Sequence, residues 1–311
     1  MQGPRFVIPL SLAALMALVV SLGSVSAFAQ DDPLVRARRA LALSNYPLAE
    51  KELGAVKNGL RNGEAQVLEV RLKLWTGRYA DAVKVAKQAA RLGSDVKTKL
   101  APWWAEALVR QGKLRQAIKV LESVKDDPNA HRARLLLGEL LIRSGKRRDA
   151  DEPLMTLVRA YNNDEIKDTD AEGLAMVGRA AHLMRAYGDA NDAYNQAERV
   201  GAKKRVDALL WRADLFLEKY DPGHAAQVVG EAAKLAPKDP RVLVAMARVK
   251  LAQAMDFGAA EELVDKALAI DPNLAEAYFV RTGLALRVMD LEAAEAAAKA
   301  GLKVDRSNLE L

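Results

Sequence analysis

Alanine recurs at one position of a repeating pattern, and this spacing constrains the fold more than any other feature of the sequence. In each repeat an apolar stretch meets a short turn, and a second apolar stretch follows with alanine near its start. The phased alanines are Ala82, Ala117, Ala150, Ala193, Ala226, Ala260 and Ala294. Their residue numbers differ successively by 35, 33, 43, 33, 34 and 34. Such a period predicts a stack of similar units, none of which can bury its apolar face alone.

The segments on either side of each turn have the periodicity of helices. The plainest turns are 76–79, 111–114 and 144–147, each with glycine at its second position, and looser versions follow in the later repeats. Two antiparallel helices approach closely only where the side chain at their crossing is small, which explains the phased alanine. Alanine also has the highest helix propensity. We therefore expect an all-α chain of helix–turn–helix units without a sheet.

This pattern resembles the tetratricopeptide (TPR) repeat, a helix–turn–helix unit of 34 residues. The residues that carry the resemblance are Trp104, Ala105, Leu108, Gly112, Ala117 and Leu121 in the third unit, Leu137, Gly138, Gly145 and Ala150 in the fourth, and Leu251, Phe257, Ala260, Ala267 and Pro272 in the seventh. The resemblance implies a right-handed superhelical solenoid whose first helices line a concave groove.

The later units depart from the TPR pattern in two respects. By this alignment the small residue of the first helix is replaced by Asp214, Arg248 and Thr282 in the last three units. The closing proline is in phase at Pro272, whereas Pro237 stands one position early. These departures leave the existence of the units intact and concern only their register.

The repeats divide the chain into five segments. We expect a signal peptide at residues 1–29, a degenerate first repeat at 30–62, and units two to four at 63–161. An acidic insertion follows at 162–173, and units five to eight occupy 174–311. Solenoids normally end in a polar capping helix, and the sequence near residue 311 does not contain one. We therefore expect the repeats to continue past the end of this chain.

The first 29 residues have the features of a cleaved export signal. Arg5 precedes an apolar run from Phe6 to Val20, and Ala27-Phe28-Ala29 forms an A-x-A cleavage signal. The run of about 15 residues is shorter than the roughly 20 that cross a bilayer. We expect cleavage after Ala29 and export to the periplasm or envelope of a bacterial cell. Contact with a membrane is expected only through the uncleaved signal segment.

The residue types needed for several kinds of chemistry are missing or scattered. The chain has no cysteine, which excludes thiol catalysis and cysteine metal sites. Its histidines, His131, His182 and His224, are too far apart for an HExxH zinc motif, and no glycine-rich phosphate loop is present. We expect no catalytic residue, no metal and no cofactor in this chain. The net charge is +6, but charges of both signs are interleaved, so we expect no nucleic-acid partner.

By the TPR resemblance, partner-binding residues lie on the groove side of the first helices. The candidates are Trp103, Glu106, Arg110, Arg132, Glu139, Arg143, Arg179, His182, Arg185, Trp211 and Glu218. Arginine and tryptophan are enriched at binding hot spots, and arginines in a groove favour an acidic or carboxylate-bearing partner. Singly, each charged residue also fits a solvated face, and Trp103 and Trp211 equally fit the core. Trp75 and Trp104 are assigned to the core.

Some TPR domains hold a C-terminal carboxylate with an asparagine-containing clamp on their first helices. No first helix between Glu64 and Arg287 contains an asparagine, so this clamp is not carried over.

Three functions fit these observations. The first is a non-catalytic scaffold of the cell envelope that binds a protein or peptide on its concave surface. The second is the N-terminal, substrate-recruiting region of a larger exported enzyme, for example a zinc metallopeptidase, with its catalytic domain beyond residue 311. The third is a structural protein that assembles through its repeat ends. The sequence assigns no oligomeric state and no partner identity.

Overall fold

The computed structural model describes residues 32–56 and 63–305, and the expected signal peptide at 1–29 lies outside them. The described residues form α-helices and two short 3-10 helices, with no strand among them. The α-helices are α2 (Pro33–Ala42), α3 (Tyr46–Ala55), α4 (Gly63–Trp75), α5 (Tyr79–Ala89), α6 (Ser94–Val109), α7 (Leu114–Glu122), α8 (His131–Arg143), α9 (Arg147–Asn162), α10 (Ala171–Leu183), α11 (Tyr187–Arg199), α12 (Val206–Glu218), α13 (Pro222–Leu235), α14 (Pro240–Ala254), α15 (Phe257–Ile270), α16 (Ala275–Arg287) and α17 (Leu291–Val304). The 3-10 helices are η2 (Ala90–Leu92) and η3 (Ala202–Lys204).

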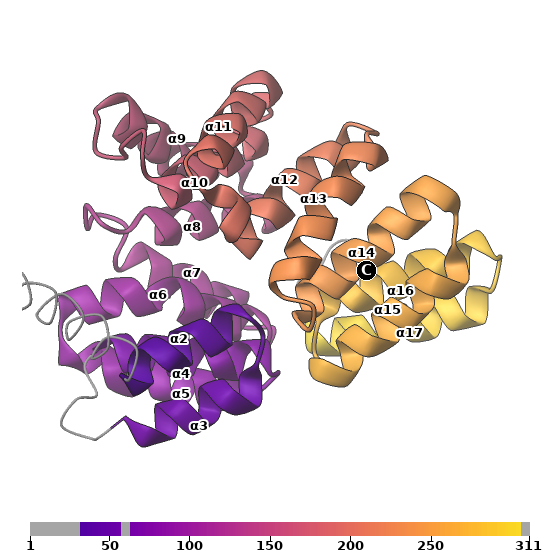
Figure 1. The fold of residues 1–311 in the computed structure, drawn as a ribbon, viewed down its shortest axis with the longest axis horizontal. Coiled ribbons are helices and arrows are strands. Elements are labelled where there is room, and N and C mark those ends of the chain that lie inside the picture. Colours follow the sequence, from indigo (N-terminus) through magenta and orange to yellow (C-terminus); the bar gives the residue numbers. More distant parts are fainter. Residues whose placement is uncertain (1–31, 57–62, 306–311) are drawn as a thin grey trace, which may run out of the picture.

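Consecutive helices pair into helix–turn–helix units, which stack in chain order (Figure 1). Even-numbered helices are the first helices of the units, and odd-numbered helices are the second. Each first helix also contacts the first helix of the next unit. This arrangement confirms the all-α solenoid expected from the repeat.

Polar side chains set where many of the helices begin. The Asp221 carboxylate accepts a hydrogen bond from the backbone N–H of His224 at 3.1 Å, and Asp290 accepts one from Ala293 at 2.9 Å. These bonds satisfy N–H groups that have no partner inside the helix. Proline follows the capping residue in α13 and α14, where its missing N–H costs nothing.

Each first helix is followed, within three residues, by a residue in the left-handed region of backbone space. These residues are Ser44, Gly77, Gly112, Gly145, Arg185, Tyr220, Met255 and Met289, with φ between 49° and 78°. Glycine adopts this conformation without a steric penalty, whereas other residues pay for it. The turn signals in the sequence therefore mark true helix ends, including the loose signals that lack glycine.

The crossing of the two helices in a unit is filled by a small, buried residue, but two of the predicted alanines are wrong. Ala190 and Ala225 are fully buried, whereas Ala193 and Ala226 are partly exposed. The interval across the insertion is therefore 40 residues, from Ala150 to Ala190. The error arose because the second helices of both units carry neighbouring alanines that the sequence pattern could not separate.

The corrected register removes the apparent departures at Asp214 and Arg248, whereas Thr282 remains at the small-residue position of α16. Ala213 and Ala247 are the buried small residues of α12 and α14, so Asp214 and Arg248 are their neighbours and not replacements. Pro237 now stands 12 residues after Ala225, as Pro272 stands 12 after Ala260. In α8 the small residue is Gly138, where a Cβ would lie 2.5 Å from a methyl carbon of Leu154. The close approach of the two helices there depends on glycine.

The connection between α9 and α10 is shorter than the predicted insertion at 162–173. Asn162 ends α9 and Ala171 begins α10. Ile166, in the middle of the connection, is buried, so apolar contact holds the segment against the helices. The extra length of this unit therefore comes from the length of α9 as well as from the loop.

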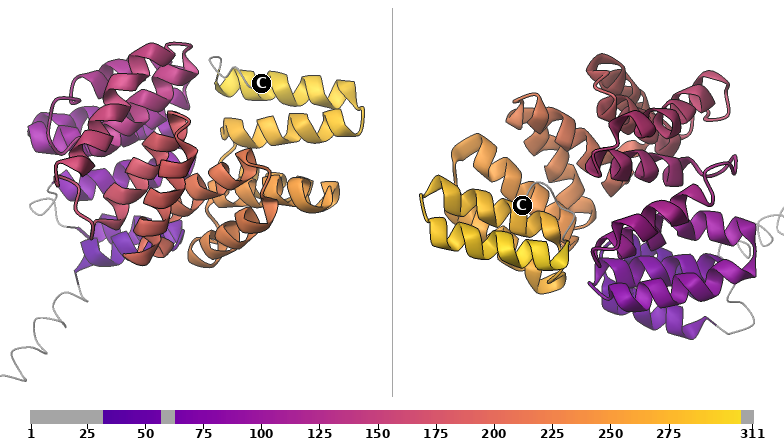
Figure 2. Two further views of the ribbon diagram at one scale, coloured as in Figure 1. Left: turned by 90° about the horizontal axis from the view of Figure 1, so that it is seen from above. Right: turned by 180° about the vertical axis from the view of Figure 1, so that it is seen from behind.

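The solenoid curls until its C-terminal units face its N-terminal units (Figure 2). The Tyr79 hydroxyl at the start of α5 donates to the buried Asp271 carboxylate at 2.7 Å. Two further ion pairs cross the same boundary, Arg110 with Glu276 and Arg143 with Asp305. We call these three pairs the seam. Ile270 packs against both the N-terminal and the C-terminal apolar clusters, so the seam also has an apolar contact.

Candidate partner-binding surface

The first helices line the inner side of the curled solenoid, where they enclose a groove of about 500 Å³. We call it the inner groove. Its lining comes from α6, α8, α10, α12, α14 and α16. Seven of the eleven predicted partner-binding residues meet in it: Glu106, Arg110, Arg132, Glu139, Arg143, Arg179 and Trp211. Leu136, Ile142 and Leu183 supply partly buried apolar surface between these polar groups.

The other four predicted residues lie elsewhere. Trp103 is buried and lines neighbouring cavities. His182 Nε2 pairs with the Glu218 carboxylate at 2.7 Å, outside the lining of the inner groove. Arg185 is exposed and occupies the left-handed turn after α10. The predicted position of Arg185 on the groove side of a first helix is therefore wrong, because the helix ends before it.

The charged residues of the inner surface form a ladder of ion pairs between successive units. Arg179 pairs with Glu139 at 2.8 Å and with Asp214 at 3.4 Å, and Arg248 extends the ladder by pairing with Asp214 at 2.6 Å. These four residues occupy one position of the repeat. Opposite charges on adjacent first helices thus hold the units in register along the inner side.

A second set of pairs joins the starts of the first helices around Asp207. Arg132 and Arg241 both bind this carboxylate, Arg241 at 2.7 Å, and Arg241 also binds Asp239 at 2.7 Å. Burial alone would raise the pKa of Asp207, but the charges of Arg132 and Arg241 outweigh it and hold that pKa well below its usual range. Asp207 is therefore a fixed anion between two fixed cations.

These pairs change the expected electrostatics of the groove. Arg110, Arg132, Arg143 and Arg179 each have a carboxylate partner within the chain. An acidic partner would have to compete with those carboxylates. The sequence could not show this, because the pairs join residues that are brought together only by the stacking and curling of the units.

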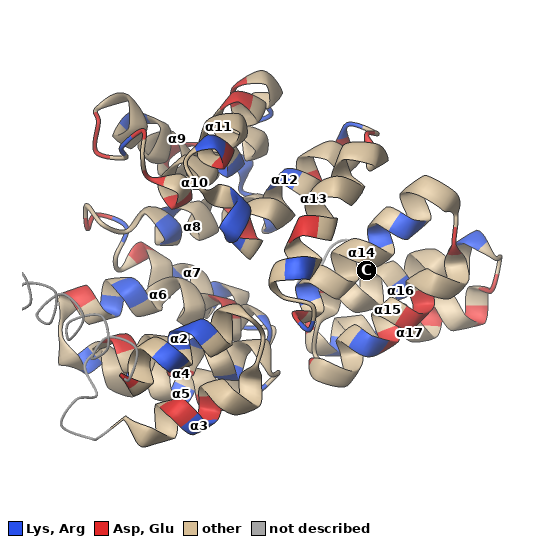
Figure 3. Cartoon of the chain, viewed as in Figure 1, with Lys and Arg blue, Asp and Glu red and all other residues tan. Residues whose placement is uncertain are grey.

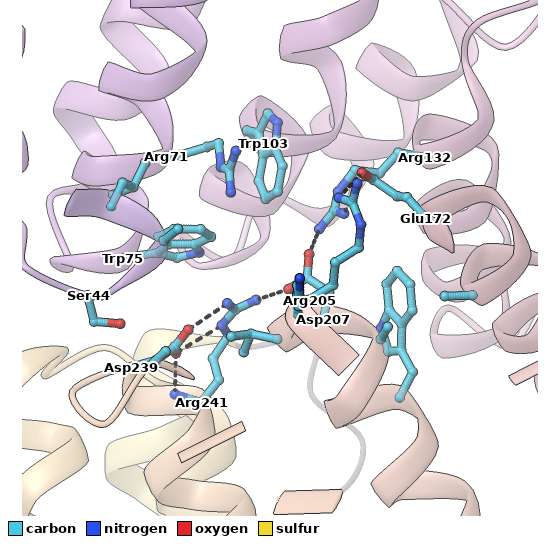
Figure 4. A pocket seen from close by; sticks show the side chains of 18 residues that line it. Ser44, Arg71, Trp75, Trp103, Arg132, Glu172, Arg205, Asp207, Asp239 and Arg241 are labelled. Atoms are coloured by element: carbon cyan, nitrogen blue, oxygen red, sulfur yellow. Dashed lines mark hydrogen bonds and ion pairs between the residues drawn. The ribbon is translucent and has the colours of Figure 1, made fainter. Parts of the chain in front are cut away.

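A smaller cavity of about 190 Å³ lies beside the groove, between the N-terminal units and the starts of α12 and α14 (Figure 4). Trp75, Trp103 and Trp211 line it, together with Arg71 of α4. Trp75 and Trp103 make an edge-to-face contact with ring centroids 6.1 Å apart. Trp75 is buried, as expected for a core residue, yet it also forms a wall of this cavity. We call this space the Arg71 cavity.

Arg71 was missed in the sequence, although the repeat contained a signal for it. Arg71 occupies the same repeat position as Glu106, Glu139 and Arg179, since their numbers differ by 35, 33 and 40, as do those of the corrected alanines from Ala82 to Ala190. The candidate residues began only at the third unit. Extending the register by one unit would have found Arg71.

Other kinds of site are not evident in the described residues. Within residues 32–56 and 63–305, no group of histidine and carboxylate side chains is placed to hold a metal ion. Over the same ranges, no helix has both the length and the apolar character needed to cross a membrane. Lysine and arginine are interspersed with aspartate and glutamate along the described helices (Figure 3).

Comparison with known proteins agrees with the helix–turn–helix units. A family model described as tetratricopeptide repeat matches residues 108–172. No curated protein matches the chain. Among solved structures, one chain of the APC/C hetero-tetramer Cut9–Hcn1 is similar, with a TM-score of 0.59 and 14% identity. That match covers 83% of this chain and 50% of the other, so this chain spans half the length of that protein.

Two further solved structures are less similar in overall shape. PilF of Pseudomonas aeruginosa has 17% identity and a TM-score of 0.41, over 70% of this chain and 96% of its own. YrrB, described as a TPR protein with an unusual peptide-binding site, has 16% identity and a TM-score of 0.38, over 62% of this chain and 93% of its own.

The fold of these units supports an interaction scaffold in general terms, because TPR surfaces bind proteins or peptides. The repeat in the sequence, the stacked helix pairs and the comparisons together show that this chain contains tetratricopeptide repeats and has the fold of a TPR solenoid.

Proposed function

We propose that the chain is a protein-binding scaffold of a bacterial cell envelope that holds an extended peptide segment of a partner in its inner groove. One observation carries this proposal: seven predicted partner-binding residues from four first helices converge on a single groove of about 500 Å³. That volume lies within the range of roughly 300–1,000 Å³ typical of ligand-binding clefts. It accommodates a peptide segment and not a folded domain.

The chemistry of the groove suits a peptide with apolar side chains. Leu136, Ile142 and Leu183 offer apolar surface, and the ion-pair ladder on the same helices supplies fixed hydrogen-bonding groups. Because the charges are already paired, they cost little further desolvation when a neutral backbone lies across them. Affinity would come from apolar contact, with the paired charges orienting the segment.

Selection from a displayed peptide library tests the proposal on the chain from residue 30 onward. An enriched peptide should bind the Leu136→Glu variant about tenfold more weakly or worse, a loss of about 1.4 kcal/mol or more. Leu92→Glu is the matched control, because Leu92 is exposed and lies outside the groove lining. Equal weakening in both variants, or none in the first, would contradict binding in the groove.

We propose further that the chain acts outside the cytoplasm. The support is the apolar run and the A-x-A signal at the start of the sequence. Sequencing the N-terminus of the protein isolated from the envelope fraction of an expressing cell tests this. The expected first residue is Gln30, and a chain that still begins at Met1 and remains in the cytoplasm would overturn the proposal.

A further inference from the structure

Arg71 differs from the arginines around it because its guanidinium has no carboxylate partner. The described residues supply it with neither a hydrogen bond nor an ion pair, and its Nε atom is buried. Arg132, Arg179 and Arg241, on the same inner surface, each bind one or two carboxylates. Burying a polar group without a partner costs free energy, so an unpaired guanidinium facing a cavity favours binding of an anion there.

Two tryptophan rings lie next to the Arg71 guanidinium. The Cζ atom lies 4.7 Å from the ring centre of Trp75 and 4.6 Å from that of Trp103. These rings stabilise the cation through their π faces. They do not accept its five N–H donors, which point along the edges of the plane. In Figure 4, dashed lines connect Arg132 with Asp207 and Arg241 with Asp207 and Asp239, and no dashed line reaches Arg71.

The charge balance of the Arg71 cavity favours an anion. Five cationic side chains line it, Arg71, Arg132, Lys204, Arg205 and Arg241, against three carboxylates, Glu172, Asp207 and Asp239. Burial and the nearby charges of Arg132 and Arg241 together lower the pKa of Arg71 to about 10. A carboxylate would offset part of this positive excess.

The size and position of the cavity indicate what kind of molecule carries that carboxylate. Its volume of about 190 Å³ is below the roughly 300–1,000 Å³ of clefts that hold a complete small ligand. Arg132, Asp207, Trp211 and Arg241 line both this cavity and the inner groove. A segment lying in the groove can therefore place one residue in the cavity.

We propose that the Arg71 cavity binds a carboxylate of the peptide held in the inner groove. Two carboxylate oxygens accept hydrogen bonds from the edge of the Arg71 guanidinium, and the carbon atoms next to the carboxylate pack against Trp75 and Trp103. The carboxylate belongs either to the end of the peptide chain or to an aspartate or glutamate side chain. This inference rests on the proposed function and specifies which chemical group of the partner is recognised.

Three short peptides test the proposal through the indole N–H signals of the tryptophans in NMR spectra. The probes are acetyl-Gly-Gly-Leu with a free carboxylate, its C-terminal amide, and acetyl-Gly-Asp-Leu-amide, whose only carboxylate is on a side chain. At least one carboxylate probe should shift the Trp75 and Trp103 signals saturably at up to about 10 mM, and the neutral amide should bind about tenfold more weakly or worse. Comparing the two carboxylate probes identifies the source.

Two variants assign the carboxylate to Arg71. Arg71→Met keeps the aliphatic stem between the indoles and should lose the preference for the acid over the amide. Lys87→Gln removes one exposed positive charge outside the lining of this cavity, and its affinity should stay within about twofold of the parent. Should Arg71→Met not fold, Arg71→Lys keeps the charge but removes the planar fork, and should weaken the acid probe about tenfold.

The outcomes separate this inference from the proposed function. Equal binding of acid and amide probes, the absence of any saturable shift, or an unchanged acid preference in Arg71→Met would overturn the carboxylate site. Library peptides that still depend on Leu136 would then leave the groove proposal standing. Conversely, a carboxylate preference at Arg71 with no effect of Leu136→Glu on any peptide would keep the cavity site and remove the groove.

Discussion

At the scale of single residues, the turns show how a non-glycine residue can hold a conformation that favours glycine. Gly77, Gly112 and Gly145 occupy the left-handed turn position in three units, while Tyr220 and Met289 occupy it in later units. The left-handed conformation costs an L-residue roughly 1–2 kcal/mol. The later units bear this cost because packing of the two helices in each unit fixes the turn between them.

Gly145 gives a direct measure of that cost. Its φ is +78°, and a Cβ added there would meet no atom within 4 Å, so Gly145→Ala introduces backbone strain alone. We expect the free energy of unfolding to fall by about 1 kcal/mol in a denaturant titration. Gly230, in the middle of α13, also has open space but no positive φ. Gly230→Ala should therefore raise stability by about 0.5–1 kcal/mol, and a loss in both variants would contradict the turn geometry.

Asp207 links stability to pH through its two arginines. Its folded-state pKa is depressed, so its contribution to stability is complete above the unfolded-state pKa of about 3.9 and is lost as the pH falls below that value. At pH 7, Asp207→Asn should lower the free energy of unfolding by about 1.5–3 kcal/mol. The gap between variant and parent should narrow below about pH 4, and a gap that stays constant down to pH 2 would show that Asp207 is not held as an anion.

At the scale of helices, the sequence predicted the units but not their register throughout. A period near 34 with one small residue per crossing follows from packing within a unit, and both partners of that contact lie close together in the chain. The register slipped where alanine occurs twice nearby, as at Ala225 and Ala226. Two neighbouring alanines have the same hydrophobicity, so the sequence pattern cannot tell which of them is buried. Only the direction in which each side chain points from the helix distinguishes them.

These neighbouring alanines make a matched test of the register. Ala225 is fully buried at the crossing of α12 and α13, whereas Ala226 is partly exposed. Ala225→Leu should overpack the crossing and lower the free energy of unfolding by about 1–3 kcal/mol. Ala226→Leu should change it by about 0.5 kcal/mol or less. Thermal or denaturant unfolding measures the stability of both variants. If Ala226→Leu were the less stable of the two, Ala226 and not Ala225 would lie at the helix crossing.

At the scale of the whole molecule, the seam could not be foreseen from the sequence. Tyr79 and Asp271 lie 192 residues apart, and their hydrogen bond depends on how much the solenoid curls. That curvature is the sum of small rotations between successive units, which no local pattern encodes. For the same reason the sequence identified most of the groove residues but not their partners Asp207, Glu276 and Asp305.

Weakening the seam should open the molecule. The double variant Tyr79→Phe with Arg110→Gln removes the hydroxyl that reaches Asp271 and the cation that pairs with Glu276. The chain has no native cysteine, so spin labels at Lys87→Cys and Ala296→Cys, both exposed, report a single distance between the two ends of the solenoid. We expect this distance to become longer and more widely distributed in the double variant.

Tyr187→Phe is the control for the seam. It removes a hydroxyl that donates to Glu218 at 2.7 Å, between adjacent units. Its distance distribution should match that of the parent. If the double variant also matched the parent, the two ends would be held by contacts other than the seam.

Photo-cross-linking shows most directly where a bound partner lies on the molecule. A light-activated amino acid is placed at Leu136 or Ile142 in the inner groove, or at the exposed residues Leu92 or Met155 outside it. Each version is irradiated with a peptide enriched from the library. We predict adducts from the two groove positions and none above background from the other two. Adducts formed mainly at Leu92 or Met155 would contradict binding on the inner surface.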